Sequence, residues 1–195
     1  MEMSSVTSYV SIGIGTFLLI YFVVIFNNLV ALKNNAKKAW ANIDVLLKQR
    51  HDELPKLIET CKQYMQYESQ TLEKITLARQ KAVQARQSGD IQAMGQAESY
   101  LKGMLGNLFA LAENYPDLKT NETFTHLQKR ISGLENSIAD RRELYNESVT
   151  LNNIRIEQIP DIIIAKLFGF KHLETLEFAS DELRDIDVGA QFKQT

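Results

Sequence analysis

The chain has 195 residues, and its 22 basic and 24 acidic side chains give a formal net charge of −2. This near balance argues against a nucleic-acid-binding protein, whose phosphate-facing surface usually carries a basic excess. The single cysteine excludes an intramolecular disulfide and a cysteine-based zinc site. Only three prolines and nine glycines interrupt the sequence, so long helices are expected.

The first predicted element is an uncharged apolar stretch from Tyr9 to Phe26. As a helix of about 18 residues it would extend about 27 Å, close to the roughly 30 Å hydrocarbon core of a bilayer. It predicts a transmembrane helix over residues 9–29, preceded by a short extracytoplasmic N-terminus, residues 1–8. A cleaved signal peptide is one alternative, but no Lys or Arg precedes the stretch and no Ala-x-Ala-like site follows it. A buried core helix is the other.

The charges that flank this stretch predict its orientation. No Lys or Arg precedes it, whereas Lys33, Lys37 and Lys38 follow it closely. Positively charged flanks are retained in the cytoplasm. We therefore expect a single-pass protein of the cell (inner) membrane, with its N-terminus outside and the rest of the chain in the cytoplasm.

Apolar residues keep helical spacing from Leu29 to the region before Pro160. Their steps of three and four residues are typical of amphipathic helices, and no segment alternates with the period of two that strands show. The pattern predicts four helices joined by short loops, so neighbouring helices are antiparallel. The expected fold class is therefore all-α: an N-terminal transmembrane helix followed by an antiparallel up-and-down four-helix bundle over residues 30–160.

Turn and capping residues set the expected helix boundaries. The first break is expected at Asp52, which can cap a second helix that carries Pro55 in its first turn. The second break is expected at Gly89. Pro116 is expected to stop the third helix, and Asn121 to cap the fourth.

Charged residues interrupt the apolar stripes of these helices. The candidate ion network comprises Glu68, Arg79, Glu98, Glu135 and Arg141. Counting residues from the predicted turns places Arg79 level with Glu98, and Glu98 level with Glu135, so Arg79 is expected to bridge the two carboxylates. Such networks add specificity of packing more than stability. A polar patch that faces a partner and a metal or catalytic site are the alternatives.

Motifs for catalysis or metal binding are absent from the sequence. Di-metal bundles need Glu-x-x-His at i, i+3 on two helices, and the sequence has none. It also lacks a phosphate-binding glycine loop, a Gly-x-Ser-x-Gly elbow and a His-Glu-x-x-His motif. Cys61 lies on an apolar stripe and is expected in the core. We therefore expect no metal, no cofactor and no enzymatic activity; catalysis by the carboxylates of the ion network is a competing hypothesis.

Two segments follow Pro160. Residues 161–172 are expected to form a short apolar helix that either packs against the base of the bundle or lies in the membrane interface. The side chains that would meet the bilayer are Ile162, Ile163, Ile164, Leu167, Phe168 and Phe170. Residues 173–195 form an acidic tail that is expected to be disordered, with a partner-binding motif as the alternative.

Most of the chain, from about Asn27 to Phe170, carries characteristic blocks: FNNLVALKN, AWANIDVLLKQRHDELPKLIE, LFALAENYPDLKTNETFTHLQ, ENSIADRRELYNESV and IAKLFGF. These blocks resemble the LemA family. The resemblance implies a bacterial single-span membrane protein with a helical bundle and no established catalytic activity. Some relatives take part in building magnetosome membranes, which suggests a scaffold or adaptor at a membrane.

Together these features favour a membrane-anchored, non-enzymatic adaptor or scaffold. It would present its helical bundle to unidentified protein partners, contact the lipid bilayer and bind no nucleic acid. The alternative is a membrane-shaping structural protein that forms a homo-oligomer and docks residues 161–170 on the bilayer.

Overall fold

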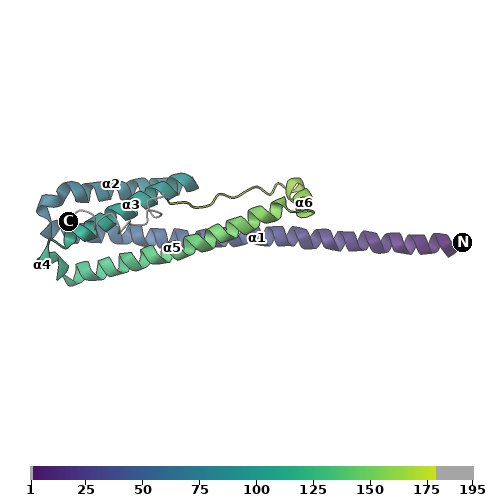
Figure 1. Cartoon of the computed structure of the whole chain (residues 1–195), viewed down its shortest axis with the longest axis horizontal. Helices are drawn as coiled ribbons and strands as arrows, with labels where there is room; N and C mark the ends of the chain where they lie inside the picture. The colour runs from purple at the N-terminus through teal and green to yellow at the C-terminus, as the bar shows by residue number, and fades with distance from the viewer. Residues whose placement is uncertain (1, 179–195) are drawn as a thin grey trace, which may run out of the picture. The chain divides into compact units, whose positions relative to one another are not determined.

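The computed structural model describes residues 2–178, and over this range it is all-helical, as predicted. Its helices are α1 (Glu2–Tyr64), α2 (Ser69–Ser88), α3 (Ile91–Ala112), α4 (Pro116–Lys119), α5 (Glu122–Glu157) and α6 (Asp161–Leu167), with a 3₁₀ turn, η1 (Gln66–Glu68) (Figure 1). Within this range the chain divides into two compact units. Unit 1 combines residues 2–42 with 143–175, and unit 2 combines residues 43–142 with 176–178, so that α1 and α5 contribute to both.

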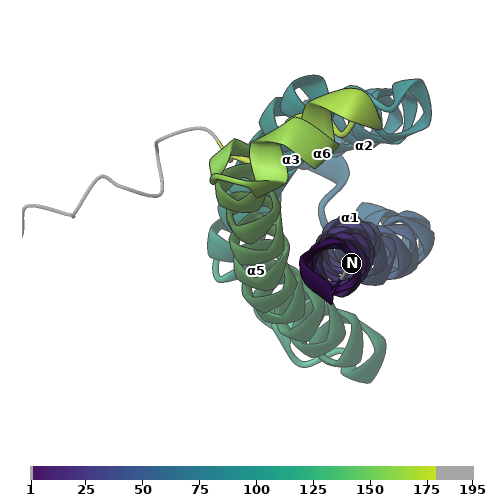
Figure 2. The same ribbon diagram turned by 90° about the vertical axis from the view of Figure 1, so that its right-hand side faces the viewer.

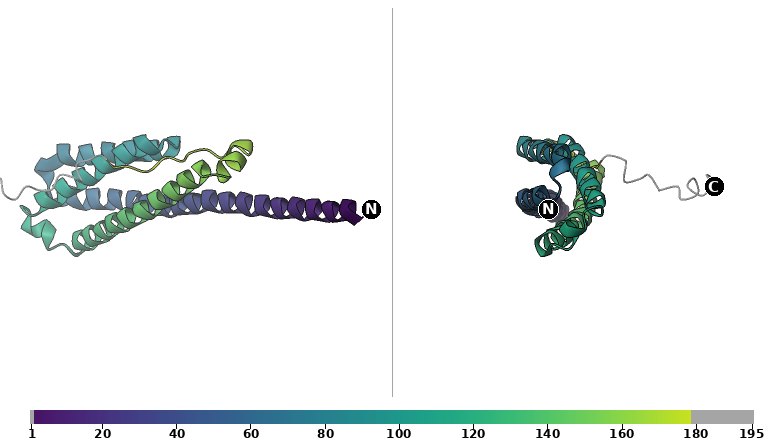
Figure 3. Two further views of the ribbon diagram at one scale, coloured as in Figure 1. Left: turned by 45° about the vertical axis from the view of Figure 1, so that its right-hand side comes forward. Right: turned by 90° about the vertical axis from the view of Figure 1, so that its left-hand side faces the viewer.

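The expected break at Asp52 is wrong, because α1 continues without interruption through Pro55 and ends at Tyr64 (Figure 3). Proline has no N–H, so Pro55 leaves the carbonyl group of His51, four residues earlier, without its helical partner. The side chain of Arg79 on α2 replaces that partner, since its Nε donates a hydrogen bond of 2.8 Å to the His51 oxygen. An interior proline costs a helix about 3 kcal/mol, and this tertiary contact offsets part of that cost.

The remaining turns follow local chemistry, and the boundaries expected at Gly89 and Asn121 are confirmed. Gly89 ends α2 in the left-handed conformation, with φ of 74°, which glycine adopts without steric strain. Asp90 caps α3 by accepting a 2.8 Å hydrogen bond from the backbone N–H of Ala93. The side chain of Asn121 accepts a 3.0 Å bond from the N–H of Phe124 and so caps α5.

The core of unit 2 is apolar and is built from the C-terminal part of α1 together with α2, α3 and the N-terminal part of α5. Cys61 belongs to this core, is fully buried and has a pKa that burial raises to about 12, so the prediction of a core cysteine is confirmed. Among the other buried residues of the cluster are Leu54, Leu57, Met65, Leu72, Ile75, Leu101, Leu105, Leu108, Phe124 and Ile131.

Residues 173–178, which were expected to be disordered, hold defined positions in the structure. In unit 1, the side chain of Asn153 both donates to and accepts from the backbone of Leu173, at 2.9 Å each way. In unit 2, Leu176 is fully buried and the backbone of Glu177 lies directly over Gly95 of α3. Side-chain hydrogen bonds and one buried anchor therefore order this segment. The rest of the predicted acidic tail, 179–195, lies outside the described residues.

The contact at Gly95 predicts that Gly95→Ala weakens the docking of residues 176–178. A Cβ at this position would lie 2.1 Å from the carbonyl oxygen of Glu177, so the segment has to move. Gly103→Ala is the control in the same helix, because nothing lies within 4 Å of its Cβ. That change should instead stabilise the protein by about 0.5–1 kcal/mol through helix propensity.

The measurement is urea unfolding of the full-length protein in detergent micelles, together with the rate of tryptic cleavage after Lys171. Gly95→Ala should speed this cleavage, whereas Gly103→Ala should leave it unchanged. Equal stability gains with no change in cleavage would contradict the close packing at Gly95.

Candidate functional site

The first candidate site is a group of charged side chains enclosed in unit 2, which we call the ion cluster: Arg50, His51, Glu98 and Glu135. The guanidinium of Arg50, on α1, donates through Nη2 to Glu98 on α3 and through Nη1 to Glu135 on α5. His51 Nε2 lies 3.0 Å from the second oxygen of Glu98. Three helices thus meet at one cation.

The ion cluster is closed to solvent. The side chains of Arg50 and Glu98 are 1% and 0% exposed, and that of Glu135 is 14% exposed. Removing these charges from water is costly, and the hydrogen bonds between them compensate only when all partners are in place. No substrate can reach Glu98, so this geometry supports a structural rather than a catalytic role.

Sequence analysis placed Arg79 between Glu98 and Glu135, and the structure corrects this assignment. The two carboxylates do come together, but on Arg50, while Arg79 donates to the backbone of His51. The buried Nε of Arg50 and the buried Nδ1 of His51 have no hydrogen-bond partner within residues 2–178.

Sequence reasoning missed Arg50 because the supposed break at Asp52 divided one apolar stripe into two. In a continuous helix, Ile43, Leu47, Arg50 and Leu54 follow each other in steps of four, three and four. A charge at such a position is the same signal that singled out Glu98, and it would have pointed to Arg50.

The other two residues of the predicted network lie elsewhere. Glu68, in η1, accepts a 3.1 Å hydrogen bond from the hydroxyl of Tyr115, and partial burial together with the Glu68 carboxylate raises the pKa of this tyrosine. Arg141 is exposed on α5. Its neighbour Arg142 lies on the packed side, with its guanidinium 4.2 Å from the ring centroid of Phe178.

We predict that Arg50→Met destabilises unit 2 by about 3–5 kcal/mol, because it leaves the fully buried carboxylate of Glu98 without its cation. Arg141→Met, the same chemical change at an exposed site of α5, should alter stability by no more than about 0.5 kcal/mol. The measurement is urea unfolding of the full-length protein in micelles, followed by circular dichroism.

The double variant Arg50→Met/Glu98→Leu separates the loss of the ion pair from the cost of leaving a buried carboxylate unpaired. It should lose less stability than Arg50→Met alone, since the unpaired buried charge is gone. If Arg50→Met and Arg141→Met have equal effects, the ion cluster does not contribute to stability in the way described.

The second candidate site, in unit 1, starts with the apolar surface of α1. This helix is long and apolar enough to cross a membrane. In its most apolar 18-residue window only 6% is buried, which contradicts the alternative of a buried core helix. Large exposed side chains cover the surface of this stretch: Tyr9, Val10, Ile12, Ile14, Phe17, Leu18, Leu19, Ile20, Tyr21, Val23 and Val24.

The short helix α6 packs on the end of this apolar stretch (Figures 1 and 2). The ring of Phe168 lies 4.9 Å from that of Phe26 and 5.9 Å from that of Phe22. A small buried cluster continues the contact and consists of Ile25, Leu29, Ile156, Ile164 and Ala165. The start of α6 is held by an ion pair of 2.6 Å between Asp161 and Arg155.

The six side chains expected at the membrane interface divide into two groups. Ile164 is buried against the protein, and Ile162 and Phe170 are half-buried. Ile163, Leu167 and Phe168 are exposed, with exposed fractions of 66%, 72% and 50%. The segment therefore packs against the protein through one face and leaves a second apolar face open.

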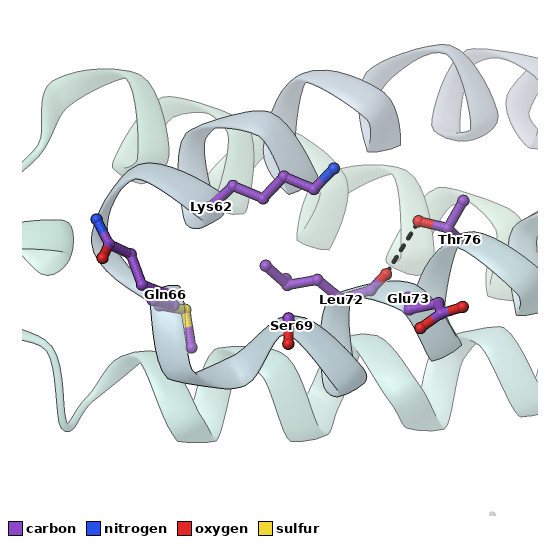
Figure 4. Close-up of a pocket in the computed structure, with 7 residues that line it drawn as sticks. Lys62, Gln66, Ser69, Leu72, Glu73 and Thr76 are labelled. Atoms are coloured by element: carbon purple, nitrogen blue, oxygen red, sulfur yellow. Dashed lines mark hydrogen bonds between the residues drawn. The ribbon is translucent and has the colours of Figure 1, made fainter.

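The side chains that line a hollow beside η1 do not form a catalytic or metal-binding arrangement. It is lined by Lys62, Met65, Gln66, Ser69, Leu72, Glu73 and Thr76 (Figure 4). The hydrogen bond drawn there runs from the Thr76 hydroxyl to the Leu72 carbonyl within one helix. Nowhere in residues 2–178 do three His, Cys, Asp or Glu side chains gather in a way that could hold a metal ion.

Comparison with known proteins assigns the helical region to a family. Residues 39–190 match the LemA family, which is more than half of the chain. The chain belongs to the LemA family. The match begins after the apolar stretch of α1, so the candidate membrane span rests on its own hydropathy and exposure rather than on the LemA match.

Among its relatives are two magnetosome proteins and one LemA protein. The chain is 24% identical over 172 residues to magnetosome protein MamQ of Magnetospirillum gryphiswaldense, and 26% identical over 172 residues to MamQ 2 of Paramagnetospirillum magneticum. These matches cover 76% of this chain but only 63% of each MamQ protein. Protein LemA of Metamycoplasma hominis is 27% identical over 177 residues, which cover 85% of this chain and 79% of that protein.

Proposed function

We propose that this LemA family protein is a non-enzymatic adaptor that α1 anchors in a bacterial membrane and that presents its helices to protein partners. One observation carries the proposal: a single uninterrupted helix bears an exposed apolar surface long enough to cross a bilayer and then enters the folded core. The ion cluster supports a non-catalytic role, because its central carboxylate, Glu98, is fully buried and closed to any substrate.

The orientation follows from the flanking charges. Lys33, Lys37 and Lys38 are exposed and lie directly after the apolar stretch, where they retain that end in the cytoplasm. In this proposal the N-terminus lies outside, and the part of the chain that follows the apolar stretch of α1 lies in the cytoplasm beside the inner membrane.

A stripe on α5 supplies a surface for protein partners. Leu144, Leu151 and Ile154 are about half exposed, and their spacing of seven and three residues places them on one face of the helix. Exposed apolar side chains gathered on one face are typical of protein–protein contacts. The three residues belong to unit 1 and lie outside the apolar stretch of α1.

A second candidate function is a membrane-shaping structural protein that forms a homo-oligomer and docks residues 161–170 on the bilayer. The open apolar face of α6 favours it, as does the similarity to proteins named for the magnetosome. The two candidates differ in what the α5 stripe contacts: another protein, or a second copy of this chain.

The proposed orientation predicts the behaviour of reporters fused after Thr195. A reporter that is active only in the cytoplasm should be active, and one that is active only outside should be silent. Replacing Lys33, Lys37 and Lys38 together by Gln should shift activity toward the external reporter, because it removes the positive charges that hold this end of α1 in the cytoplasm. Activity of the external reporter on the unaltered chain would overturn the cytoplasmic placement.

Photocrosslinking at the α5 stripe tests the adaptor proposal. A photoreactive residue at Leu151 should trap a defined partner protein in cells. The same residue at Ser132, an exposed position of α5 more than three helical turns before Leu144, should trap far less. Adducts with other copies of this chain would favour the structural homo-oligomer instead, and the absence of any specific adduct at Leu151 would contradict both candidates.

A further inference from the structure

We propose that α6 and its surroundings form a second membrane contact that binds the headgroups of anionic phospholipids. We call this the α6 lipid surface, and it consists of Ile163, Leu167, Phe168, Lys33, Lys166 and Lys171. The proposal rests on the proposed anchoring of α1 and adds a lipid class to it.

The first argument is position. Phe168 packs on Phe22 and Phe26, which form the last turns of the apolar stretch of α1. With that stretch in the hydrocarbon core, these two rings lie where the hydrocarbon ends and the headgroups begin. α6 contacts both, so its exposed face lies at the same depth and continues the lipid-facing surface of α1.

The second argument is the amphipathic character of α6. Ile164 and Ala165 are buried against α1 and α5, whereas Ile163 and Leu167, four residues apart, point away from the protein. Gly169, with φ of 69°, then turns the chain so that the N–H of Phe170 donates to the carbonyl of Ala165 at 2.9 Å. An apolar side flanked by lysines is typical of helices that lie in the headgroup region.

The third argument is charge. Lys166, in the last turn of α6, and Lys171, five residues after it, are exposed. Lys33 Nζ lies 5.8 Å from the ring centroid of Phe170, so a third cation lies beside the same segment. Within residues 2–178 none of them forms an ion pair.

Two acids near α6 have partners of different charge. Asp161 binds Arg155 at 2.6 Å, and Glu157 lies 3.0 Å from His172, which is charged only when it is protonated. The three lysines outnumber the Glu157 carboxylate even when His172 is neutral. The surface is therefore net positive and complements a phosphate-bearing anionic headgroup. Each lysine close to an anionic membrane raises binding by about fivefold.

The test uses the full-length protein in vesicles, with a fluorophore on a single introduced cysteine. The reporter on Leu167→Cys probes α6, Phe17→Cys probes the α1 anchor, and Tyr67→Cys, at a fully exposed position after α1, is the aqueous control. The native Cys61 is fully buried and does not compete for the label. All three introduced cysteines replace exposed side chains, so the fold is retained.

Quenching by brominated lipids then reports which lipid lies beside each position. One set of vesicles carries brominated phosphatidylglycerol among phosphatidylcholine, and the other carries brominated phosphatidylcholine among phosphatidylglycerol. We expect the Leu167→Cys reporter to be quenched with a severalfold preference for phosphatidylglycerol. The Phe17→Cys reporter should be quenched by both lipids, and the Tyr67→Cys reporter by neither.

Charge variants identify the source of the preference. Lys166→Gln/Lys171→Gln should abolish most of this severalfold preference for phosphatidylglycerol, because each lysine contributes up to about fivefold to binding at an anionic surface. Lys62→Gln/Lys74→Gln, at exposed lysines of unit 2, is the matched control and should leave it unchanged.

The remaining outcomes separate this inference from the anchoring on which it rests. Equal quenching of the α6 reporter by both lipids, or an unchanged preference in Lys166→Gln/Lys171→Gln, would overturn recognition of anionic headgroups. Quenching at Phe17→Cys without quenching at Leu167→Cys would place α6 in water or under protein and reject the α6 lipid surface, while the anchor stands. No quenching at Phe17→Cys would reject both.

Discussion

The continuity of α1 is the constraint on which the rest of the structure depends. One helix carries the exposed apolar stretch, the residues that α6 covers, and a large share of the core of unit 2. Pro55 is the weak point in this helix, because it removes a backbone hydrogen bond within the part of α1 that packs into unit 2. Arg79 restores a donor to the freed carbonyl of His51 from another helix. Secondary structure here is thus completed by a tertiary contact.

The ion cluster lies next to that contact and likewise joins α1 to other helices of unit 2. Arg50 and His51 are consecutive on α1, and the carboxylates that they meet come from α3 and α5. Apolar stripes of Leu and Ile tolerate a helix that slides by one turn, but a buried carboxylate left without its cation does not. The cluster therefore selects one register among the helices of unit 2, at a desolvation cost that an apolar core would avoid.

Unit 1 differs from unit 2 in what it exposes. Unit 2 buries charged side chains, whereas unit 1 leaves apolar side chains exposed. The exposed side chains of α1, the open face of α6 and the stripe on α5 occupy distinct positions on this unit. In our proposals a membrane removes the first from water, lipid headgroups contact the second and a protein partner covers the third. Such a division suits an adaptor, because an adaptor acts by binding other molecules through its surfaces and not by catalysing a reaction.

The sequence by itself determined the all-α class, the uncharged stretch at its N-terminal end, the turn at Gly89 and the cap at Asn121, because these depend on hydropathy, periodicity and local backbone chemistry. It also marked Glu98 and Glu135 as charges that meet. Only the tertiary structure decided that α1 passes Pro55, that Arg50 rather than Arg79 joins the two carboxylates, and that residues 173–178 pack onto the helices. Each of these depends on a partner far away in the chain: a guanidinium from α2, a carboxylate from α3, or the bare backbone of Gly95. Local patterns can mark a buried charge such as Glu98, but they do not identify its partner, and they do not show that a distant guanidinium or backbone will stabilise Pro55 or residues 173–178.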